Sequence, residues 1–271
     1  MVEVRAVALD HEFVVEAPEP LAHILEASLA PIAVASSEAR GAERIGIRRD
    51  GDEGWVMRLD GVDSRPTPPG RLVAGLLEHI NRRAAESVVR GVPLHAAAVA
   101  HPDGGVIALA GSSGSGKSTL GAAAVRAGWG FVAEEVTAVS AGDREVRPYH
   151  RPIGLRAGGA AAVGIPIPDA EWFDEVYPWP VPVEARRNGG ALLGIAMVER
   201  TDGDCDAVDV PPARALAELV EHTVVPTHDR IVQVFRALDR LVRVVPVVRL
   251  SAGAPSSTIE VLDELSRTWN A

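Results

Sequence analysis

Gly111-Ser112-Ser113-Gly114-Ser115-Gly116-Lys117-Ser118-Thr119 fits the pattern G-x-x-x-x-G-K-[ST] of a phosphate-binding loop. An apolar run, GVIALA (105–110), precedes this stretch, and a helical pattern over 117–127 follows it. A buried strand, a glycine-rich turn and a helix in this order let backbone N–H groups converge on phosphate oxygens at the positive end of the helix. The sequence therefore predicts that all nine residues bind a nucleoside triphosphate.

Two side chains of the loop are expected to carry its charge and metal chemistry. Lys117 is predicted to reach the β and γ phosphates of ATP, and the Ser118 hydroxyl is predicted to ligate Mg²⁺. The alternative interpretation is a Gly/Ser turn before a helix, with an exposed lysine. ATP and Mg²⁺ are the cofactors that the full pattern indicates.

The composition limits the partners of the chain. Its 271 residues contain 27 Lys+Arg against 37 Asp+Glu, a formal net charge of −10, whereas a nucleic-acid binder needs a basic surface. The single Cys205 excludes an intramolecular disulfide, and no apolar stretch approaches the roughly 20 residues of a membrane span. The N-terminus lacks the pattern of a signal peptide. We expect a soluble cytoplasmic protein with neither nucleic acid nor membrane as a partner.

Residues 1–90 are predicted to form a small α+β module. Two short strands join at Asp10-His11, a helical pattern begins after Pro20, and a hairpin-like turn separates two further strands at 51–53. The last element is a helix whose apolar residues share one face, namely Leu72, Leu76, Leu77, Ile80 and Ala84.

Residues 91–271 are predicted to form the nucleotide-binding domain. Nearly continuous apolar runs are typical of strands that are buried on both faces. Amphipathic patterns indicate three further helices. The predicted strands are 93–100, 105–110, 131–133, 136–140, 191–199 and 245–250, and the predicted helices are 117–127, 211–221, 230–245 and 256–269.

The segment 141–190 is rich in glycine and proline and concentrates four aromatic residues, Trp172, Phe173, Tyr177 and Trp179. Two interpretations are open. The segment is either a lid or substrate loop, or a meander that the aromatic side chains hold together.

Glu134 and Glu135 follow the predicted strand 131–133, and Glu135 comes eighteen positions after Lys117. Because ligand sites in such sheets gather where strands end, we expect both carboxylates beside the phosphates. One of the two is predicted to bind Mg²⁺, directly or through water, and the other to accept the proton of an attacking hydroxyl. Two solvated acids at a turn are the alternative, and Glu199, after the apolar strand 191–199, is an alternative metal ligand. The guanine-specific N-K-x-D and the LSGGQ motifs are missing from the sequence.

His95 lies in the apolar run that precedes the strand of the loop. If the two strands pair through the turn at 101–104, His95 lies near the start of the loop or one strand away from it. A histidine in such a strand is either a core residue or a member of the site.

These motifs together resemble the C-terminal kinase domain of the HPr kinase/phosphorylase family. The similarity covers residues 93–140, where LHAAAVA, VIALA, GSSGSGKS and AAAVRAGWGFVAEE follow the family's order. The whole chain is similar to HPr-kinase-like proteins found with ribosomally made peptides, including lasso peptides, through the segments RPIGLR and VPVVRLSAG. The resemblance implies an α/β fold with a kinase core of the HPr kinase/phosphoenolpyruvate carboxykinase type, after the N-terminal module. It also suggests a homo-oligomer.

The resemblance also implies roles for single residues. His95 assists at the γ-phosphate, Lys117 and the loop amides bind the nucleotide, and Ser118 binds Mg²⁺. Glu135 takes the place of the proton acceptor, although the family proper has Asp-Asp at this pair. Arg186 or Arg187, in PVEARRNGG, supplies positive charge to the transition state; the alternative is two surface arginines at a glycine turn.

Three functions follow as hypotheses. The first is an ATP- and Mg²⁺-dependent kinase that transfers the γ-phosphoryl group to a serine hydroxyl of a peptide or small protein. The second is a kinase for a hydroxyl of a small molecule. The third is a non-catalytic module in which ATP only orders the fold.

Overall fold

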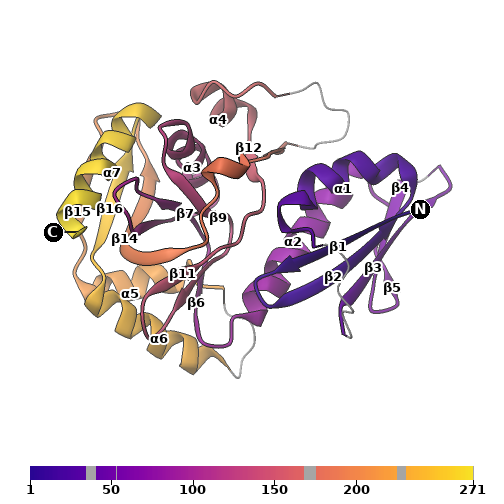
Figure 1. The fold of residues 1–271 in the computed structure, drawn as a ribbon, viewed down its shortest axis with the longest axis horizontal. Coiled ribbons are helices and arrows are strands. Elements are labelled where there is room, and N and C mark those ends of the chain that lie inside the picture. The colour runs from indigo at the N-terminus through magenta and orange to yellow at the C-terminus, as the bar shows by residue number, and fades with distance from the viewer. Residues whose placement is uncertain (35–40, 53, 168–174, 225–229, 271) are drawn as a thin grey trace.

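The computed structural model describes residues 1–34, 41–52, 54–167, 175–224 and 230–270, and the chain has a mixed α/β fold with two main sheets (Figure 1). The predicted Trp172 and Phe173 lie outside the described residues. Among the helices within these ranges, none combines the length and apolar character needed to cross a membrane.

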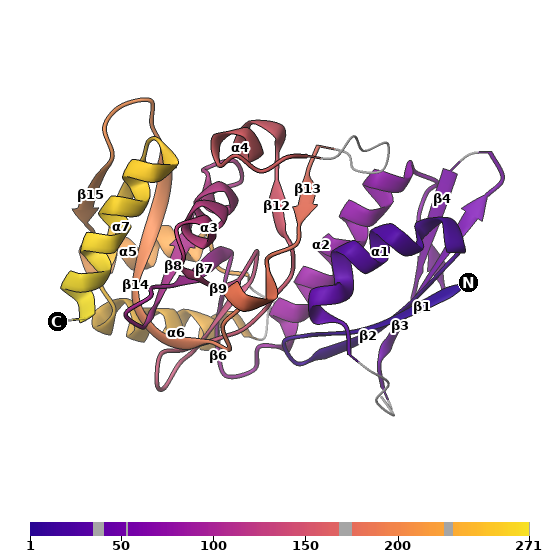
Figure 2. The ribbon, with the colours of Figure 1, turned by 45° about the horizontal axis from the view of Figure 1, so that its top comes forward.

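The first 87 residues build a five-stranded sheet with two helices on one face (Figures 1 and 2). The strands lie in chain order, and β2 and β3 are parallel while the other neighbours are antiparallel. The apolar stripe of each helix covers the inward-facing strand residues. The elements are β1 (Val2–Ala8), β2 (His11–Ala17), α1 (Ala22–Leu29), β3 (Glu43–Asp50), β4 (Gly54–Leu59), β5 (Val62–Asp63) and α2 (Pro69–Ser87).

A nine-stranded mixed sheet forms the second part, in the order β6-β10-β11-β14-β8-β7-β9, with β16 on β14 and β15 on β16. Its centre is the parallel set β8, β14 and β16, whose apolar residues are buried. The strands are β6 (Gly91–Leu94), β7 (Ala96–Ala100), β8 (Val106–Ala110), β9 (Gly130–Ala133), β10 (Thr137–Ser140), β11 (Glu145–Arg147), β14 (Gly190–Arg200), β15 (Asp206–Asp209) and β16 (Val247–Ala252).

The single strand predicted over 93–100 is wrong, because the chain breaks at His95 into β6 and β7. The His95 N–H donates to the His222 carbonyl oxygen at 2.7 Å instead of joining a strand ladder. Strand β6 then pairs with β10, whereas β7 pairs with β8 and β9. The break therefore directs the His95 side chain to a position between two branches of the sheet.

Helices cover both faces of the large sheet (Figure 1). Helices α3 and α7 share one apolar cluster with one face, and α5 and α6 share the other cluster with the opposite face. The segment 141–190 contributes two short paired strands, β12 and β13, and the short helix α4. These elements are α3 (Lys117–Arg126), β12 (Ile153–Leu155), α4 (Ala157–Ala162), β13 (Tyr177–Trp179), α5 (Pro212–Val220), α6 (Ile231–Val244) and α7 (Pro255–Asn270).

Helix α2 lies between the two sheets and ties them together (Figures 1 and 2). The Tyr149 hydroxyl donates to Asn81 Oδ1 at 2.9 Å, and the Arg147 guanidinium bonds both oxygens of Asp10 at 2.6 and 2.7 Å. One apolar cluster runs from the first sheet through α2 to the second. The predicted boundary at residue 90 falls between α2 and β6, inside this continuous core.

Candidate functional site

The nine-residue loop follows β8, between the neighbouring strands β7 and β14, and α3 begins at Lys117. Gly111 has a φ of 154°, and a Cβ there would lie 2.7 Å from the Val198 carbonyl oxygen and 2.7 Å from Ser115 Oγ. Gly114 and Gly116 have φ of 84° and 107°. The wrapped backbone therefore needs glycine at these positions.

The Lys117 ammonium is held over the loop that it follows. Its Nζ donates to the carbonyl oxygens of Gly111 at 2.6 Å and Ser112 at 3.0 Å, and the side chain is buried. Burial lowers the pKa of Lys117, and the charges of Glu135 and Glu134 oppose that shift. An ammonium that donates to two carbonyl oxygens at this point can exchange them for phosphate oxygens.

Ser118 and Glu134 meet as the sequence predicts. Ser118 Oγ donates to Glu134 Oε1 at 2.6 Å, joining the first turn of α3 to the end of β9. Glu134 is 2% exposed, and among the described residues its Oε2 has no hydrogen-bond partner. Burial, and next the charge of Glu135, raise the pKa of Glu134 to about 7. A buried carboxylate with an unused oxygen beside a hydroxyl fits a hard divalent cation.

The residues at this point form a partial cation site. Within the described ranges, no group of three or more His, Cys, Asp or Glu side chains could enclose a metal ion by itself. Mg²⁺ usually keeps several waters and combines one or two protein ligands with phosphate oxygens. Ser118 and Glu134 therefore suit Mg²⁺ that arrives with a nucleotide.

Glu135 sits on a strained backbone turn next to Glu134. Its φ is +66°, and the Val136 N–H donates to the Glu134 carbonyl oxygen at 2.8 Å, which closes a three-residue turn. A non-glycine residue in this region costs about 1–3 kcal/mol, and such strain clusters at functional sites. The turn points the two carboxylates apart, so Glu134 is buried while Glu135 lines a cavity.

His95 faces Glu135, and a second histidine lies close by. His95 Nδ1 is 3.3 Å from Glu135 Oε2, and both side chains are about one-third exposed. Burial lowers the pKa of His222, and the nearby charges of Lys117 and His95 lower it further. His222 was missed by the sequence prediction, because only the backbone bridge between Leu94 and Thr223 brings it to the site.

Arg151 is the second residue that the sequence prediction missed as a site residue. It is 8% exposed, it lines the same cavity as Glu135, and its charge acts on Glu134. Among the described residues, its Nε has no hydrogen-bond partner. The RPIGLR segment was noticed only through the family resemblance, and no spacing in the sequence pointed to its first arginine.

The predicted arginines lie elsewhere. The Arg186 guanidinium donates to the Val181 carbonyl oxygen at 3.0 and 3.2 Å, and its charge acts on His150. The Arg187 N–H donates to the Phe131 carbonyl oxygen at 2.8 Å, in the middle of β9 rather than at its end. The arginine whose charge acts on Glu134 is Arg151, whereas Arg186 or Arg187 was expected to supply charge to the transition state.

Glu199, the alternative metal ligand, is exposed and forms an ion pair with Arg249 at 3.1 Å. The carboxylate that contacts the Ser118 hydroxyl is that of Glu134.

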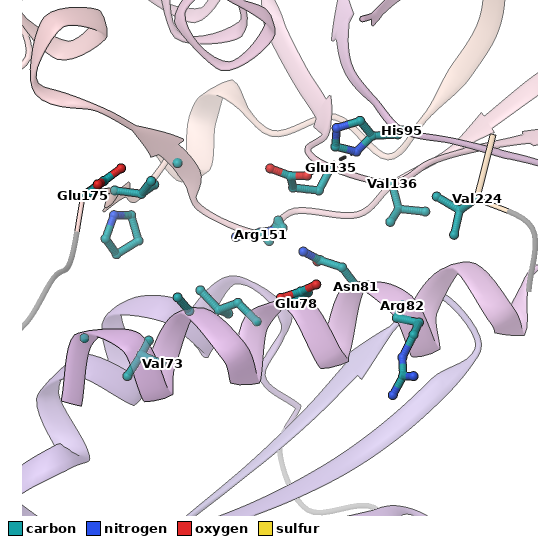
Figure 3. A pocket seen from close by; sticks show the side chains of 16 residues that line it. Val73, Glu78, Asn81, Arg82, His95, Glu135, Val136, Arg151, Glu175 and Val224 are labelled. Carbon is teal, nitrogen blue, oxygen red and sulfur yellow. Dashed lines mark ion pairs between the residues drawn. The ribbon is translucent and has the colours of Figure 1, made fainter. Parts of the chain in front are cut away.

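A cavity of about 600 Å³ opens in front of Glu135 (Figure 3). His95, Glu135 and Arg151 lie on one side of it, and α2 forms the other side. The volume falls within the range of ordinary ligand sites.

Comparison of the sequence with protein-family models and with curated proteins finds no match.

Proposed function

We propose that this chain is an ATP- and Mg²⁺-dependent kinase that transfers the γ-phosphoryl group to a serine hydroxyl of a peptide or small protein. The observation that carries the proposal is the 2.6 Å hydrogen bond between Ser118 and Glu134, which joins the phosphate loop to a buried, partly partnered carboxylate. The motif order of the sequence supports the HPr kinase/phosphoenolpyruvate carboxykinase type of core.

Nucleotide binding falls to the loop and to two of its side chains. The backbone N–H groups of residues 111–119 and the Lys117 ammonium bind the phosphates, and Ser118 and Glu134 would hold Mg²⁺. Bound Mg²⁺ would neutralise the charge that develops on the phosphate oxygens. Arg151, buried and with an unpartnered Nε, adds positive charge on the side of Glu134.

Glu135 is the proton acceptor in this proposal. The acceptor hydroxyl enters through the cavity, its oxygen forms a bond to the γ-phosphorus, and the bond from that phosphorus to the bridging oxygen of ADP breaks. The hydroxyl proton passes to Glu135, and His95 at 3.3 Å orients the carboxylate. Catalysis is mainly positioning and charge neutralisation, as phosphoryl transfer requires.

A small-molecule kinase is the second candidate, because a cavity of about 600 Å³ is also the size of a metabolite site. A non-catalytic ATP-binding module is the third. Tight ATP binding without any acceptor-dependent release of ADP would favour this third function.

The test compares three variants on a set of short serine peptides. Glu135→Gln should keep nucleotide affinity within about threefold and lose at least about 10²-fold in acceptor-dependent ADP release. Lys117→Ala should lose nucleotide binding itself. Glu260→Gln, the same change at an exposed site on α7, is the matched control. Undiminished transfer by Glu135→Gln would contradict the base assignment.

A further inference from the structure

One stripe of α2 faces the cavity in front of Glu135. The lining residues recur every three or four positions, as one face of a helix does, and include Val73, Ala74, Leu77, Glu78 and Asn81. A different face of α2, with Leu76 and Ile80, is buried in the core of the first sheet. The N-terminal part of the chain therefore builds one wall of the space that an acceptor must enter to reach Glu135 (Figure 3).

Most of the cavity wall is apolar. Ala74 and Leu77 of α2 line it together with Val136 and Val176, and Pro178 of β13 completes the apolar part. An apolar group of the ligand can be buried here. The few polar side chains that line the cavity can then fix the orientation of the ligand.

The charges at the cavity are predominantly negative. Glu78 and Glu175 line it together with Glu135, and both are exposed. Arg82 turns aside, because its Nη2 lies 3.1 Å from His79 Nδ1, and Figure 3 shows its guanidinium pointing away from Glu135. The charge of Arg151 acts on the neighbouring buried Glu134. The carboxylates of Glu78 and Glu175 therefore favour a cationic group and disfavour an anionic one.

Asn81 adds an uncharged polar side chain to the apolar and acidic residues of the cavity wall. Its Oδ1 accepts the 2.9 Å hydrogen bond from Tyr149, so its amide N–H groups are left as donors. Figure 3 shows the amide nitrogen of Asn81 directed toward the side of the cavity that holds Arg151. A backbone carbonyl of a peptide is a suitable acceptor for this donor.

We infer that the α2 stripe is the acceptor-binding wall, and that it takes a peptide segment whose serine is flanked by an apolar and a basic side chain. The apolar side chain packs on Ala74 and Leu77, and the basic side chain pairs with Glu78 and Glu175. The inference rests on the proposed function, because it identifies the acceptor of the same site.

The test uses three capped peptides, acetyl-Leu-Ser-Lys-amide, acetyl-Leu-Ser-Gln-amide and acetyl-Leu-Ser-Asp-amide. Binding to the full chain is measured by NMR titration with Mg²⁺ and a non-hydrolysable ATP analogue, and transfer is measured separately with ATP. The lysine peptide should bind at least about tenfold more tightly than the aspartate peptide. Glu78→Lys should reverse this order, while Glu26→Lys, the same change at an exposed site on α1, should preserve it.

Equal binding of the three peptides, no binding of any of them, or an equal effect of Glu78→Lys and Glu26→Lys would overturn the inference. Charge-selective binding without any transfer would support the acceptor wall and count against the kinase reaction. Transfer without charge selection would do the opposite, so the two proposals fail separately.

Discussion

Two buried glutamates of this chain are held in opposite ways. Glu43, on β3, accepts hydrogen bonds from His11 and His79 at 2.7 Å each and from Arg83 at 2.8 Å. Although burial acts to raise the pKa of Glu43, these bonds lower it to about 2. Glu134 has the Ser118 hydroxyl, and burial raises its pKa to about 7.

The difference separates a structural carboxylate from a poised one. The bonds to Glu43 satisfy its charge within the protein and join β2, β3 and α2, so it has no need of a ligand. Among the described residues Glu134 Oε2 has no hydrogen-bond partner, and the charges of Arg151 and Lys117 offset only part of the cost of burying this carboxylate. Hydrogen-bond partners, rather than burial, therefore distinguish a structural carboxylate such as Glu43 from a candidate ligand-binding carboxylate such as Glu134.

Removing the satisfied carboxylate should have the largest effect. Glu43→Ala removes the carboxylate that His11, His79 and Arg83 share, although Arg83 keeps its ion pair with Glu86, and should lower the free energy of unfolding by about 3 kcal/mol. Urea unfolding at pH 7 measures the change. Because the folded-state pKa of Glu43 lies below the ordinary 4.5, its contribution is complete above pH 4.5 and is lost as the pH falls toward 2. Glu12→Ala, at an exposed site on β2, is the control; an equal loss there would break the comparison.

Replacing the arginine beside the poised carboxylate should have the next largest effect. Arg151→Met removes a positive charge from the side of Glu134 and should lower kcat for phosphoryl transfer about 10²-fold. Arg186→Met should lower it less, since the Arg186 guanidinium is bonded to Val181. Steady-state kinetics with Arg156→Met as an exposed control rank the two. A larger loss with Arg186→Met would restore the sequence-based assignment.

Neutralising the poised carboxylate should have the smallest effect and the opposite sign. The pKa of Glu134 is about 7 in the folded chain against an ordinary 4.5, so its contribution to stability falls as the pH rises from 4.5 to 7. Glu134→Gln should therefore stabilise the protein at pH 8 by about 2 kcal/mol and change it little at pH 4.5.

Thermal unfolding at the two pH values checks this prediction. The same melts with Mg²⁺ and ATP should show that the variant loses the Mg²⁺-dependent part of its stabilisation. A variant that is less stable than the parent at pH 8 would contradict the assignment of Glu134 as a carboxylate that burial destabilises.

The part of the site predictable from sequence is the part held by short-range contacts. The loop, α3 and β9 follow one another directly, so the approach of Glu134 to Ser118 could be predicted from their order. Arg151 and His222 could not, because turns and a backbone bridge between distant segments place them. The break at His95 could not be predicted either, because the apolar pattern of residues 93–100 suits two short strands as well as one.

The fold pattern was predictable where periodicity is strong. The helices α6 and α7 and the central strand β14 lie close to their predicted ranges, and α2 contains the residues of the predicted apolar face. Leu77, in the predicted apolar stripe of α2, packs against the core as expected but also lines the cavity. Helical periodicity shows which residues share one face of a helix. It does not show whether that face packs on the protein core or lines a ligand cavity.

The placement of α2 has a consequence for evolution and engineering. One helix closes the core of the first sheet and also walls the cavity before Glu135. A substitution on its cavity stripe can thus alter which molecules reach the carboxylate without touching the phosphate loop. The module 1–90 is then the part of the chain in which recognition can change while the chemistry stays constant.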